Sequence, residues 1–349
     1  MPDSAAPSAT PPVNVAVVGL GFMGITHLRT YLTNPSARVI AVCDTKRAPE
    51  KGVIKGIAGN IKDSADIHLG PEVRFYSKLE DLLTDSEVQL VDICTPTPLH
   101  PEQVIASLSA GKHVICEKPL ARTAAAAREI LKAAADSPGF LMPAMCMRFW
   151  PGWSWLKQAV AEKTYGKVLA ASFRRVSALP GWSPQGTYSG GLDLGGALFD
   201  LHIHDTDFVN YLFGRPADVF STGVADSTGS IHHVVTQYRY PDGPVVHAEG
   251  SWLLKKGFNM AYTLHCEHAT VDFDLARGTE KLLVTETGGS PCVVKTEDGD
   301  GYTMEIDYIL QCVANRRPPN IVTADDGITA LEICEAEEQS IRSGVTVKL

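Results

Sequence analysis

Three side chains in this sequence have the types and spacing that a proton-transfer site needs: Lys118, Asp200 and His204. Histidine exchanges a proton near neutral pH, and a lysine ammonium stabilises negative charge developing on an oxygen. Asp200 and His204 lie four positions apart, so on a helix they share one face. The alternative is a helix whose polar face points to water. The apolar residues around the pair favour a buried helix, and a buried Asp–His pair needs partners.

The position of Lys118 is set by the strand before it. The apolar run His113–Cys116 leads up to this lysine, and Pro119 follows it, so it stands at the carboxyl end of a buried strand. Ligands of open α/β sheets bind beyond the carboxyl ends of the strands. Lys118 is therefore either a solvated loop charge or a group that faces a bound ligand.

A glycine-rich turn follows the first apolar run and opens a helical segment. Residues 19–24 read Gly-Leu-Gly-Phe-Met-Gly, and an aspartate ends the next strand twenty residues past the third glycine. This context distinguishes a dinucleotide-binding motif from a simple turn, because the glycines let backbone and diphosphate approach at the start of the helix. The predicted cofactor contacts of this part of the chain are Gly19, Gly21, Phe22, Met23, Gly24 and Asp44.

The acidic residue at the end of the second strand bears on which dinucleotide is bound. Asp44 suits the ribose hydroxyls of NAD and repels the 2′-phosphate of NADP. Lys46 and Arg47 follow at once and could neutralise that phosphate, or they are a solvated charge pair. The sequence therefore predicts NAD, with Lys46 among the cofactor contacts and NADP left open.

Other residues near the predicted site bear on metal and sugar binding. His202 and His204 are two apart, which on a helix points them in different directions, so we predict no metal. Trp182 lies in an irregular segment and is the best aromatic candidate for contacting a sugar face. Arg174 and Arg175 are adjacent in a predicted strand, so only one of them can face the cleft.

The bulk composition excludes several classes of protein. The chain has 349 residues, which suggests two domains, and its net charge of −9 disfavours nucleic-acid binding. Residues 1–12 are rich in Ser, Ala and Pro and predict a disordered tail, and no apolar run is long enough for a membrane span. The eight cysteines form no C-x-x-C pair, which predicts reduced thiols in a cytoplasmic protein.

The elements that must position these residues fall into two groups. Over residues 13–137, short apolar runs alternate with helical patterns, which predicts a doubly wound parallel sheet, the Rossmann type, in an α/β protein. Over residues 138–349, strands cluster without helices between them, and Asp242-Gly243 signals a hairpin. We predict an α+β second domain there, with a mainly antiparallel open sheet. The predicted strands of the first domain are Val13–Val18, Val39–Cys43, Val88–Cys94 and His113–Cys116, with Phe140–Ala144 at the boundary.

The predicted strands of the second domain are Lys167–Ser177, His232–Tyr240, Val245–Leu254, Met260–Cys266 and Thr270–Leu275. Two helices of the first domain have local signals. Ser77 with Glu80 three residues later is a capping-box pattern, and an alanine-rich run follows Thr123 to Ala135.

Several blocks resemble the glucose–fructose oxidoreductase/inositol dehydrogenase (Gfo/Idh/MocA) family. They are residues 93–100 (Ile-Cys-Thr-Pro-Thr-Pro-Leu-His), residues 110–120 around Glu117-Lys118-Pro119, and Gly195-Gly196-Ala197-Leu198-Phe199-Asp200 running on to His204 and Asp207. The C-terminal Thr323-Ala324-Asp325-Asp326-Gly327 also matches, so the resemblance spans nearly the whole chain. Two positions depart from the family pattern: Thr97 replaces a frequent asparagine, and Met147 stands where sugar-oxidising relatives often have an arginine.

The resemblance implies roles for specific residues. Lys118, Asp200 and His204 become the catalytic group, and they also contact substrate together with Arg148 and Trp182. The residues along the nicotinamide and its ribose become Thr95, Pro96, Thr97, His100, Glu117 and Lys118.

The resemblance further implies a hydride-transferring enzyme, an NAD(P)-dependent dehydrogenase or reductase for a sugar, cyclitol or related polyol, which forms a homo-oligomer (dimer or tetramer). Two alternatives stay open. One is a hydrolase that cleaves glycosides through transient oxidation, and the other is a cofactor-sensing regulator without catalysis. The regulator has no need of the Lys118, Asp200 and His204 group.

Overall fold

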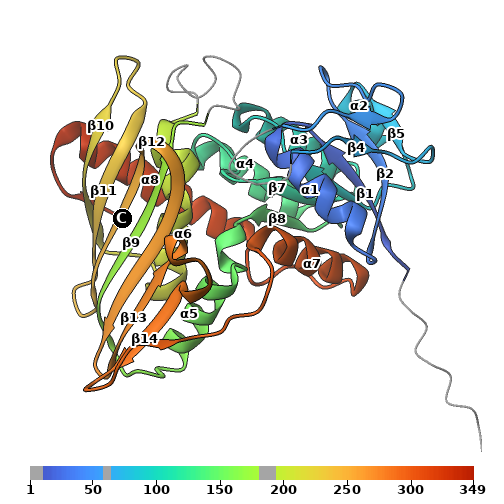
Figure 1. Cartoon of the computed structure of the whole chain (residues 1–349). Coiled ribbons are helices and arrows are strands. Elements are labelled where there is room, and N and C mark those ends of the chain that lie inside the picture. The colour runs from blue at the N-terminus through green and yellow to red at the C-terminus, as the bar shows by residue number, and fades with distance from the viewer. Residues whose placement is uncertain (1–10, 58–63, 181–193) are drawn as a thin grey trace, which may run out of the picture.

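The structure, a computed structural model, describes residues 11–57, 64–180 and 194–349. It has two halves, each built around one large sheet, with helices between and around them (Figure 1). Trp182 lies outside the described residues, as do residues 1–10 of the predicted tail. None of the helices in the described parts of the chain is both long enough and apolar enough to cross a bilayer.

The first half contains the predicted alternation of strands and helices. Its elements are β1 (Val13–Val18), α1 (Phe22–Thr33), β2 (Ala37–Cys43), β5 (Arg74–Tyr76), α2 (Leu79–Leu83), β6 (Leu90–Ile93), α3 (His100–Ser109), β7 (His113–Glu117), α4 (Ala124–Ala135) and β8 (Leu141–Ala144). All six strands are parallel, in the order β5-β2-β1-β6-β7-β8. The order reverses direction between β1 and β6, which is where α/β sheets of this type bind nucleotides. The predicted Rossmann sheet is confirmed.

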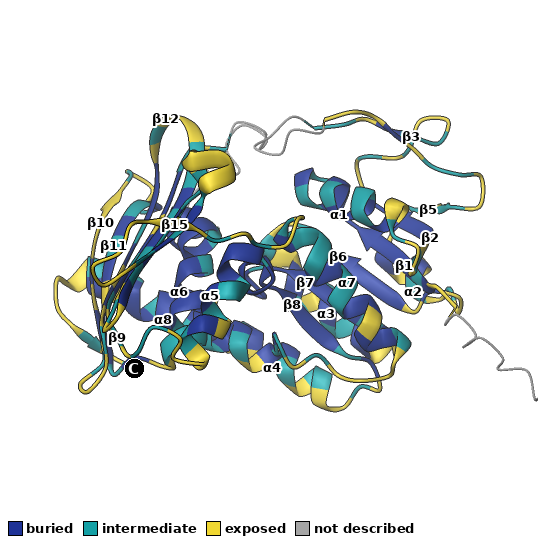
Figure 2. Ribbon diagram, turned by 60° about the horizontal axis from the view of Figure 1, so that its bottom comes forward, coloured by how far each residue is buried: buried dark blue, intermediate teal, exposed yellow. Residues whose placement is uncertain are grey.

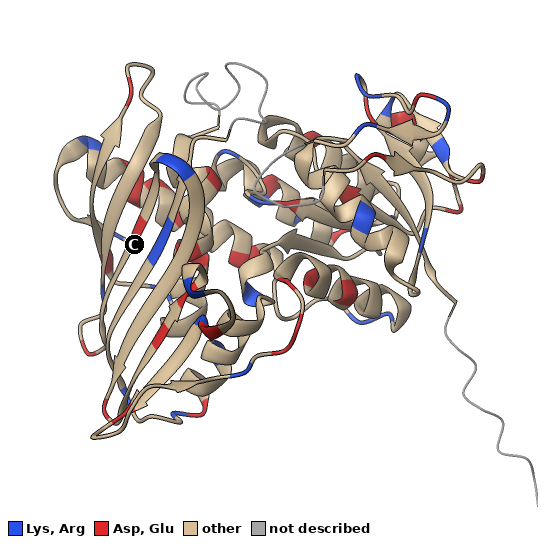
Figure 3. Ribbon diagram, viewed as in Figure 1, with Lys and Arg blue, Asp and Glu red and all other residues tan. Residues whose placement is uncertain are grey.

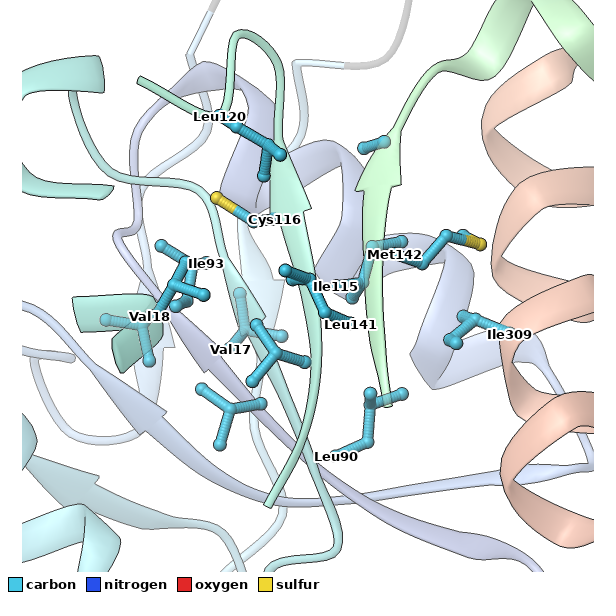
Figure 4. Close-up of a cluster of buried hydrophobic side chains, with 14 of the residues drawn as sticks. Val17, Val18, Leu90, Ile93, Ile115, Cys116, Leu120, Leu141, Met142 and Ile309 are labelled. Carbon is cyan, nitrogen blue, oxygen red and sulfur yellow. The ribbon is translucent and has the colours of Figure 1, made fainter. Parts of the chain in front are cut away.

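The core of this sheet explains why its strands read as continuous apolar runs. Strands β6, β7 and β8 are buried along almost their whole length (Figure 2). Side chains from neighbouring strands pack together, and Ile309 joins them from a helix late in the chain (Figure 4). That helix, α7 (Gly301–Ala314), packs against α1 and so returns the chain to the first sheet.

Two details of this half differ from the sequence prediction. The Ser77/Glu80 capping box is wrong: α2 begins at Leu79, after Lys78, with no side-chain cap. The first sheet also extends beyond the predicted boundary at residue 137, because β8 pairs with β7. The long segment between β2 and β5 forms a small hairpin in its described residues, of β3 (Val53–Ile54) and β4 (Ile67–His68).

The second half is the predicted mainly antiparallel sheet with helices on one face (Figure 1). Its strands are β9 (Val168–Ala178), β10 (Asp218–Ala225), β11 (Ile231–Arg239), β12 (Val245–Cys266), β13 (Ala269–Asp274), β14 (Leu282–Glu286), β15 (Cys292–Val293) and β16 (Val347–Lys348). Its helices are α5 (Pro151–Ala161), α6 (Ile203–Phe213) and α8 (Ala324–Ser343), with short 3₁₀ turns at Cys146–Arg148 and Leu275–Glu280. Another 3₁₀ turn, Thr97–Leu99, precedes α3 in the first half. The Asp242-Gly243 turn joins β11 and β12, as predicted.

The two strands predicted at Val245–Leu254 and Met260–Cys266 are the two arms of the 22-residue β12. Along residues 245–251 the partners on β9 ascend from Ala170 to Val176, whereas along residues 258–265 they descend from Ser177 to Ala170. The arms therefore run in opposite directions on the two edges of β9, and the chain reverses near Gly257, which has φ +86°.

All eight cysteines are free; six are buried, Cys266 is half-buried and Cys292 is exposed. Acidic and basic residues are interspersed over both halves of the molecule (Figure 3).

Candidate active site

The glycine turn has the geometry that a dinucleotide site needs. Gly19 has φ +90°, which favours glycine, and a Cβ there would lie 2.7 Å from the carbonyl oxygen of Cys94. A Cβ on Gly24 would lie 1.8 Å from the carbonyl oxygen of Gly19. Both glycines are therefore required for the close approach of β1, α1 and the end of β6.

Gly21 differs, because nothing in the described chain lies within 4 Å of the position of a Cβ there. It is the N-cap of α1, and no side chain in the described residues caps this helix. The start of α1 thus offers backbone amides and the positive end of the helix dipole to an open space, with Met23 half-buried beside it. These features fit the diphosphate of a dinucleotide.

Asp44 fixes the glycine turn from the end of β2. Its Oδ2 accepts the amide of Leu20 at 2.7 Å, and its Oδ1 accepts the amides of Lys46 at 2.7 Å and Arg47 at 2.8 Å. The Arg47 guanidinium donates to the carbonyl oxygens of Leu20 and Lys55. Lys46 is exposed. The carboxylate is thus already positioned where the dinucleotide motif places an adenosine ribose.

The predicted nicotinamide side follows β6 and β7. His100 is buried, with Nδ1 2.8 Å from the carbonyl oxygen of Pro119 and Nε2 2.7 Å from that of Thr95. Burial lowers the pKa of His100. The ring therefore links the loops after β6 and β7, and both its nitrogens face protein carbonyls. Pro96 is exposed and Thr97 half-buried in the turn that starts α3.

Lys118 and Asp200 meet, although they come from different halves of the chain. Lys118 Nζ donates to the carbonyl oxygen of Asp200 at 2.8 Å and to its Oδ1 at 3.1 Å. Asp200 lies in a π-helical turn, Leu198–His202, that leads into α6, a local geometry frequent at functional sites. Burial disfavours the ammonium, but Asp200 and Glu117 outweigh it and raise the pKa of Lys118. The lysine is therefore charged.

His204 is uncharged, in contrast to Lys118. Burial first, and then the positive charges of Lys118 and Arg175, lower its pKa well below the ordinary histidine value. Its Nδ1 is buried without a hydrogen-bond partner in the described part of the chain. Asp200 and His204 were predicted to share one helix face. The Asp200 carboxylate contacts Lys118, so the site combines a charged lysine with a neutral imidazole.

Three consecutive buried residues hold α6, which carries His204. Asp205 accepts a bidentate pair from Arg175 at 2.8 and 3.2 Å, as expected if one of the two adjacent arginines faces inward. The Thr206 hydroxyl lies 3.1 Å from that of Tyr238. Asp207 accepts from Arg148 at 2.9 and 2.6 Å. Contacts of three consecutive residues thus hold α6 in place. The Asp205–Arg175 pair was not predicted from the sequence.

The contacts of Arg148 do not support the predicted substrate contact. Its side chain is only 1% exposed, and its donors go to Asp207, the carbonyl oxygen of Ile321 and Asp326. These contacts favour a structural role. His202 is also packed inside, with Nε2 3.2 Å from the Tyr238 hydroxyl, so its position does not suit a metal shared with His204.

Tyr302 is a site residue that the sequence did not reveal. It lies in the first turn of α7, its ring packs edge-on against Trp150, and its hydroxyl is near Glu117 and Arg175. Burial raises its pKa well above the ordinary value. No motif marks it, because α7 returns to the first sheet from almost 160 residues after β8.

A parallel sheet with an open diphosphate-binding turn, and a lysine and histidine brought together at its carboxyl edge, define a two-domain dinucleotide-dependent oxidoreductase. Comparison with known proteins agrees. Residues 13–144 match the model of the GFO/IDH/MocA oxidoreductase family, NAD-binding Rossmann fold, and residues 153–272 match the GFO/IDH/MocA C-terminal domain. The chain belongs to the Gfo/Idh/MocA oxidoreductase family.

Individual relatives cover most of the chain. Myo-inositol 2-dehydrogenase of Thermotoga maritima is 26% identical over 97% of this chain and 98% of its own length. Trans-1,2-dihydrobenzene-1,2-diol dehydrogenase of Sus scrofa is 32% identical over 78% of this chain and 82% of its own. Levoglucosan dehydrogenase, solved with NADH and levoglucosan, has the same fold, with a TM-score of 0.80, 21% identity and coverage of 97% of this chain and 99% of its own.

Proposed function

We propose that this protein is an NAD-dependent dehydrogenase that interconverts a secondary alcohol and a ketone on a sugar, cyclitol or related polyol. The observation that carries the proposal is the contact of Lys118 with Asp200 across the two halves, beside the neutral ring of His204. The inositol, levoglucosan and dihydrodiol dehydrogenases among its relatives support this substrate class.

The residues divide the work of alcohol oxidation between them. When bound, the nicotinamide supplies the hydride acceptor. The neutral His204 takes the proton of the reacting hydroxyl as general base. Lys118 uses two donors on Asp200 and has a third for the same oxygen, where its charge stabilises a developing alkoxide. Asp200 keeps the lysine charged and in place.

The cofactor-binding residues follow from the open turn. The amides of the α1 N-terminus, at Gly21 and Met23, bind the diphosphate, and Asp44 accepts from the adenosine ribose. Thr95, Pro96, Thr97 and Glu117 line the nicotinamide side, and His100 acts through the loops it links. A large set of residues is thus assigned to one crevice at the carboxyl edge of the sheet.

We favour NAD over NADP on the geometry around Asp44. The Asp44 carboxylate remains where a 2′-phosphate would have to lie, and the Arg47 guanidinium is engaged by two backbone carbonyls. Lys46 alone is exposed beside it. The measured ratio of kcat/KM for NAD to that for NADP should therefore exceed one, and the substitution Asp44→Ser should lower it.

The decisive experiment is a panel of sugars, cyclitols and their keto forms, followed at the absorbance of reduced nicotinamide with both cofactors. We expect turnover of at least one cyclic polyol, and its loss in His204→Ala. Release of a sugar without net absorbance change would point to the hydrolase alternative instead. A folded protein that binds NAD but turns over no polyol would contradict the proposal.

We also propose that the protein forms a homo-oligomer through the outer face of the second sheet. Apolar side chains are exposed on outward positions of β10 and β12, at Phe220, Val224, Val245 and Leu253. Exposed apolar side chains on one sheet suit a symmetric interface. Light scattering should give a mass of at least twice the 37.6 kDa of the chain, and Phe220→Glu with Val245→Glu should lower it.

A further inference from the structure

A buried group of polar residues lies behind Lys118, on the side of the first sheet where α1 and α7 pack. At its centre is His27 of α1, which has no exposed surface. Its Nδ1 lies 2.8 Å from Oδ2 of Asp92, a fully buried residue of β6. A buried carboxylate and imidazole at this distance form a charge-assisted pair, and burying either one alone would be costly.

His27 connects this pair to the end of β7. Its Nε2 lies 3.4 Å from Oε1 of Glu117, and Oε2 of Glu117 accepts the backbone amide of Lys118 at 3.1 Å. A path of hydrogen bonds and one ion-pair contact, from His27 to Glu117, therefore runs from Asp92 to the backbone of Lys118. It joins the neighbouring strands β6 and β7 through a side chain of α1.

A second carboxyl group faces the same imidazole from α7. Glu305 has no exposed surface, its Oε1 lies 3.9 Å from His27 Nε2, and neither oxygen has a hydrogen-bond partner in the described residues. Burial, aided by Glu117 and Asp92 though opposed by His27, raises its pKa well above the ordinary value, so it is a neutral acid. The titratable groups around His27 are Tyr31 on α1, Asp92 on β6, Cys94 after it, Glu117 on β7, and Tyr302 and Glu305 on α7.

His27 and Glu117 carry opposite charges. Burial lowers the pKa of His27, but Asp92 and Cys94 outweigh it and raise the value well above 6.5. Burial raises the pKa of Glu117, but His27 and Lys118 outweigh it and lower the value. The imidazolium thus stands between two carboxylates and beside a neutral acid, which balances charge in a region closed to water.

A metal ion does not fit this group, although His27, Asp92 and Cys94 place ligand-type atoms within 4.8 Å of one another. The Cys94 thiol donates to Asp92 Oδ1 at 3.2 Å, and burial raises its pKa well above the ordinary value. A thiolate ligand is therefore disfavoured, and the lone pairs of Asp92 are already used. The atoms satisfy one another as a hydrogen-bonded network.

We propose that His27 is a positioning residue for the catalytic lysine. Its charged ring, held by Asp92, fixes the Glu117 carboxylate beside the Lys118 amide and so sets the direction in which Lys118 leaves β7 toward Asp200. The Glu117 charge also helps to keep Lys118 protonated, because the two are neighbours in a site of low dielectric. The catalytic part of this proposal rests on the proposed function, whereas the charge state of His27 does not.

The first test measures that charge state directly, in the protein labelled with ¹⁵N-histidine. The ring signals of His27, assigned by their loss in His27→Gln, should keep the imidazolium pattern at a pH well above the ordinary histidine pKa. In Asp92→Asn the signals should change to those of a neutral ring at lower pH. In Glu305→Gln, which replaces a neutral acid by a neutral amide, they should stay as in the parent protein.

The second test asks whether the charge acts on the lysine. Asp92→Asn and His27→Gln should lower kcat about tenfold or more, move the pH profile of kcat, and change the KM for the polyol less than about threefold. Lys112→Gln is the matched control. Lys112 is equally a buried charge of this domain, but it precedes β7 at the opposite edge of the sheet, where it donates to the carbonyl oxygens of Asp85 and Val88. This control should lose thermal stability and keep its pH profile.

The outcomes distinguish a failure of the His27 proposal from a failure of the proposed dehydrogenase function. A His27 ring that titrates near pH 6.5 in the parent protein would overturn the inference while leaving the dehydrogenase intact. So would folded His27→Gln protein with unchanged kcat and pH profile. A parent protein that turns over no polyol yet keeps the His27 imidazolium would overturn the proposed function alone. Because the first measurement is made on the parent protein, it decides the charge state even where a variant fails to fold.

Discussion

Lys118 at the end of β7 and Asp200 in the π-turn before α6 are joined by two hydrogen bonds from one ammonium, to the carbonyl oxygen at 2.8 Å and to the carboxylate at 3.1 Å. The contact links the nucleotide-binding sheet to the helix that carries His204. Because the lysine side chain is only 13% exposed, most of its solvation has been replaced by this one residue. The relative placement of the acid–base groups thus depends on a contact between the two halves.

Removal of the lysine charge should abolish most activity without unfolding the protein. Lys118→Met keeps the length of the side chain but takes away the donor to the reacting oxygen, so we expect kcat to fall by about 10²–10⁴. The kcat of Asp200→Asn should fall less than that of Lys118→Met, because the Asp200 carbonyl oxygen still accepts from the lysine. Lys132→Met, at an exposed lysine of α4, is the control and should match the parent protein. Parent-like turnover by Lys118→Met would rule out the assigned role.

The depressed pKa of His204 predicts a pH dependence of stability. The unfolded chain binds a proton on this ring below about pH 6.5, whereas the folded protein does so only at a lower pH. The stability due to the neutral ring is therefore complete above pH 6.5 and is lost as the pH falls below it. In His204→Gln this loss should disappear, so urea unfolding of parent and variant between pH 7 and pH 5 should differ in slope. Equal slopes would contradict the assignment.

The lowered pKa of His204 also predicts how kcat/KM depends on pH at the acid end of the profile. Since a general base must be unprotonated, kcat/KM for polyol oxidation should hold its value below pH 6.5 and decline only at lower pH. A decline centred near the ordinary histidine value would mean that the ring gains solvent or a partner in the working enzyme.

Substitution by alanine should have different effects at Gly21, the middle glycine of the motif, and at Gly24, an outer one. Gly21→Ala adds a methyl group where the described chain leaves open space, so the protein should fold with a melting temperature close to the parent while its Kd for NAD rises at least tenfold. Gly24→Ala collides with the Gly19 carbonyl, at 1.8 Å from its oxygen, and should lose stability first. Protein fluorescence titrated with NAD and thermal unfolding separate the two effects. NAD affinity unchanged in Gly21→Ala would place the diphosphate elsewhere.

The sequence predicted those features that local patterns encode. β1 was predicted at Val13–Val18, as observed, because a run of six residues, five of them apolar, ends at the glycine turn. The helix after Thr123 was predicted from its alanine run, and the Thr123 side chain indeed caps α4. The meeting of Lys118 with Asp200 came from family resemblance, since no local pattern joins residues 82 positions apart.

What the sequence did not predict depends on tertiary contacts. β10 was missed because its outward positions include Phe220 and Val224, which blur the alternation of apolar and polar residues. The insertion of β9 between the two arms of β12 was not predicted either, because no local pattern shows which strands pair. The buried state of Glu305 could not be foreseen, because its partner α1 lies near the other end of the chain.

Arg148 offers the clearest separation of structure from chemistry. Its guanidinium fills the space between Asp207, Asp326 and the Tyr211 ring, 4.3 Å from the ring centre, and its removal leaves Asp207 as a buried, unpaired carboxylate. Breaking such a pair costs about 3–5 kcal/mol, so Arg148→Met should unfold at a much lower urea concentration. Replacing both partners, with Arg148→Met and Asp207→Leu together, should recover part of the lost stability, because no buried charge is then left without a partner. In whichever of these variants remains folded, the KM for the polyol should stay within about twofold of the parent. An increase of tenfold or more in KM with unchanged stability would instead restore Arg148 as a substrate contact.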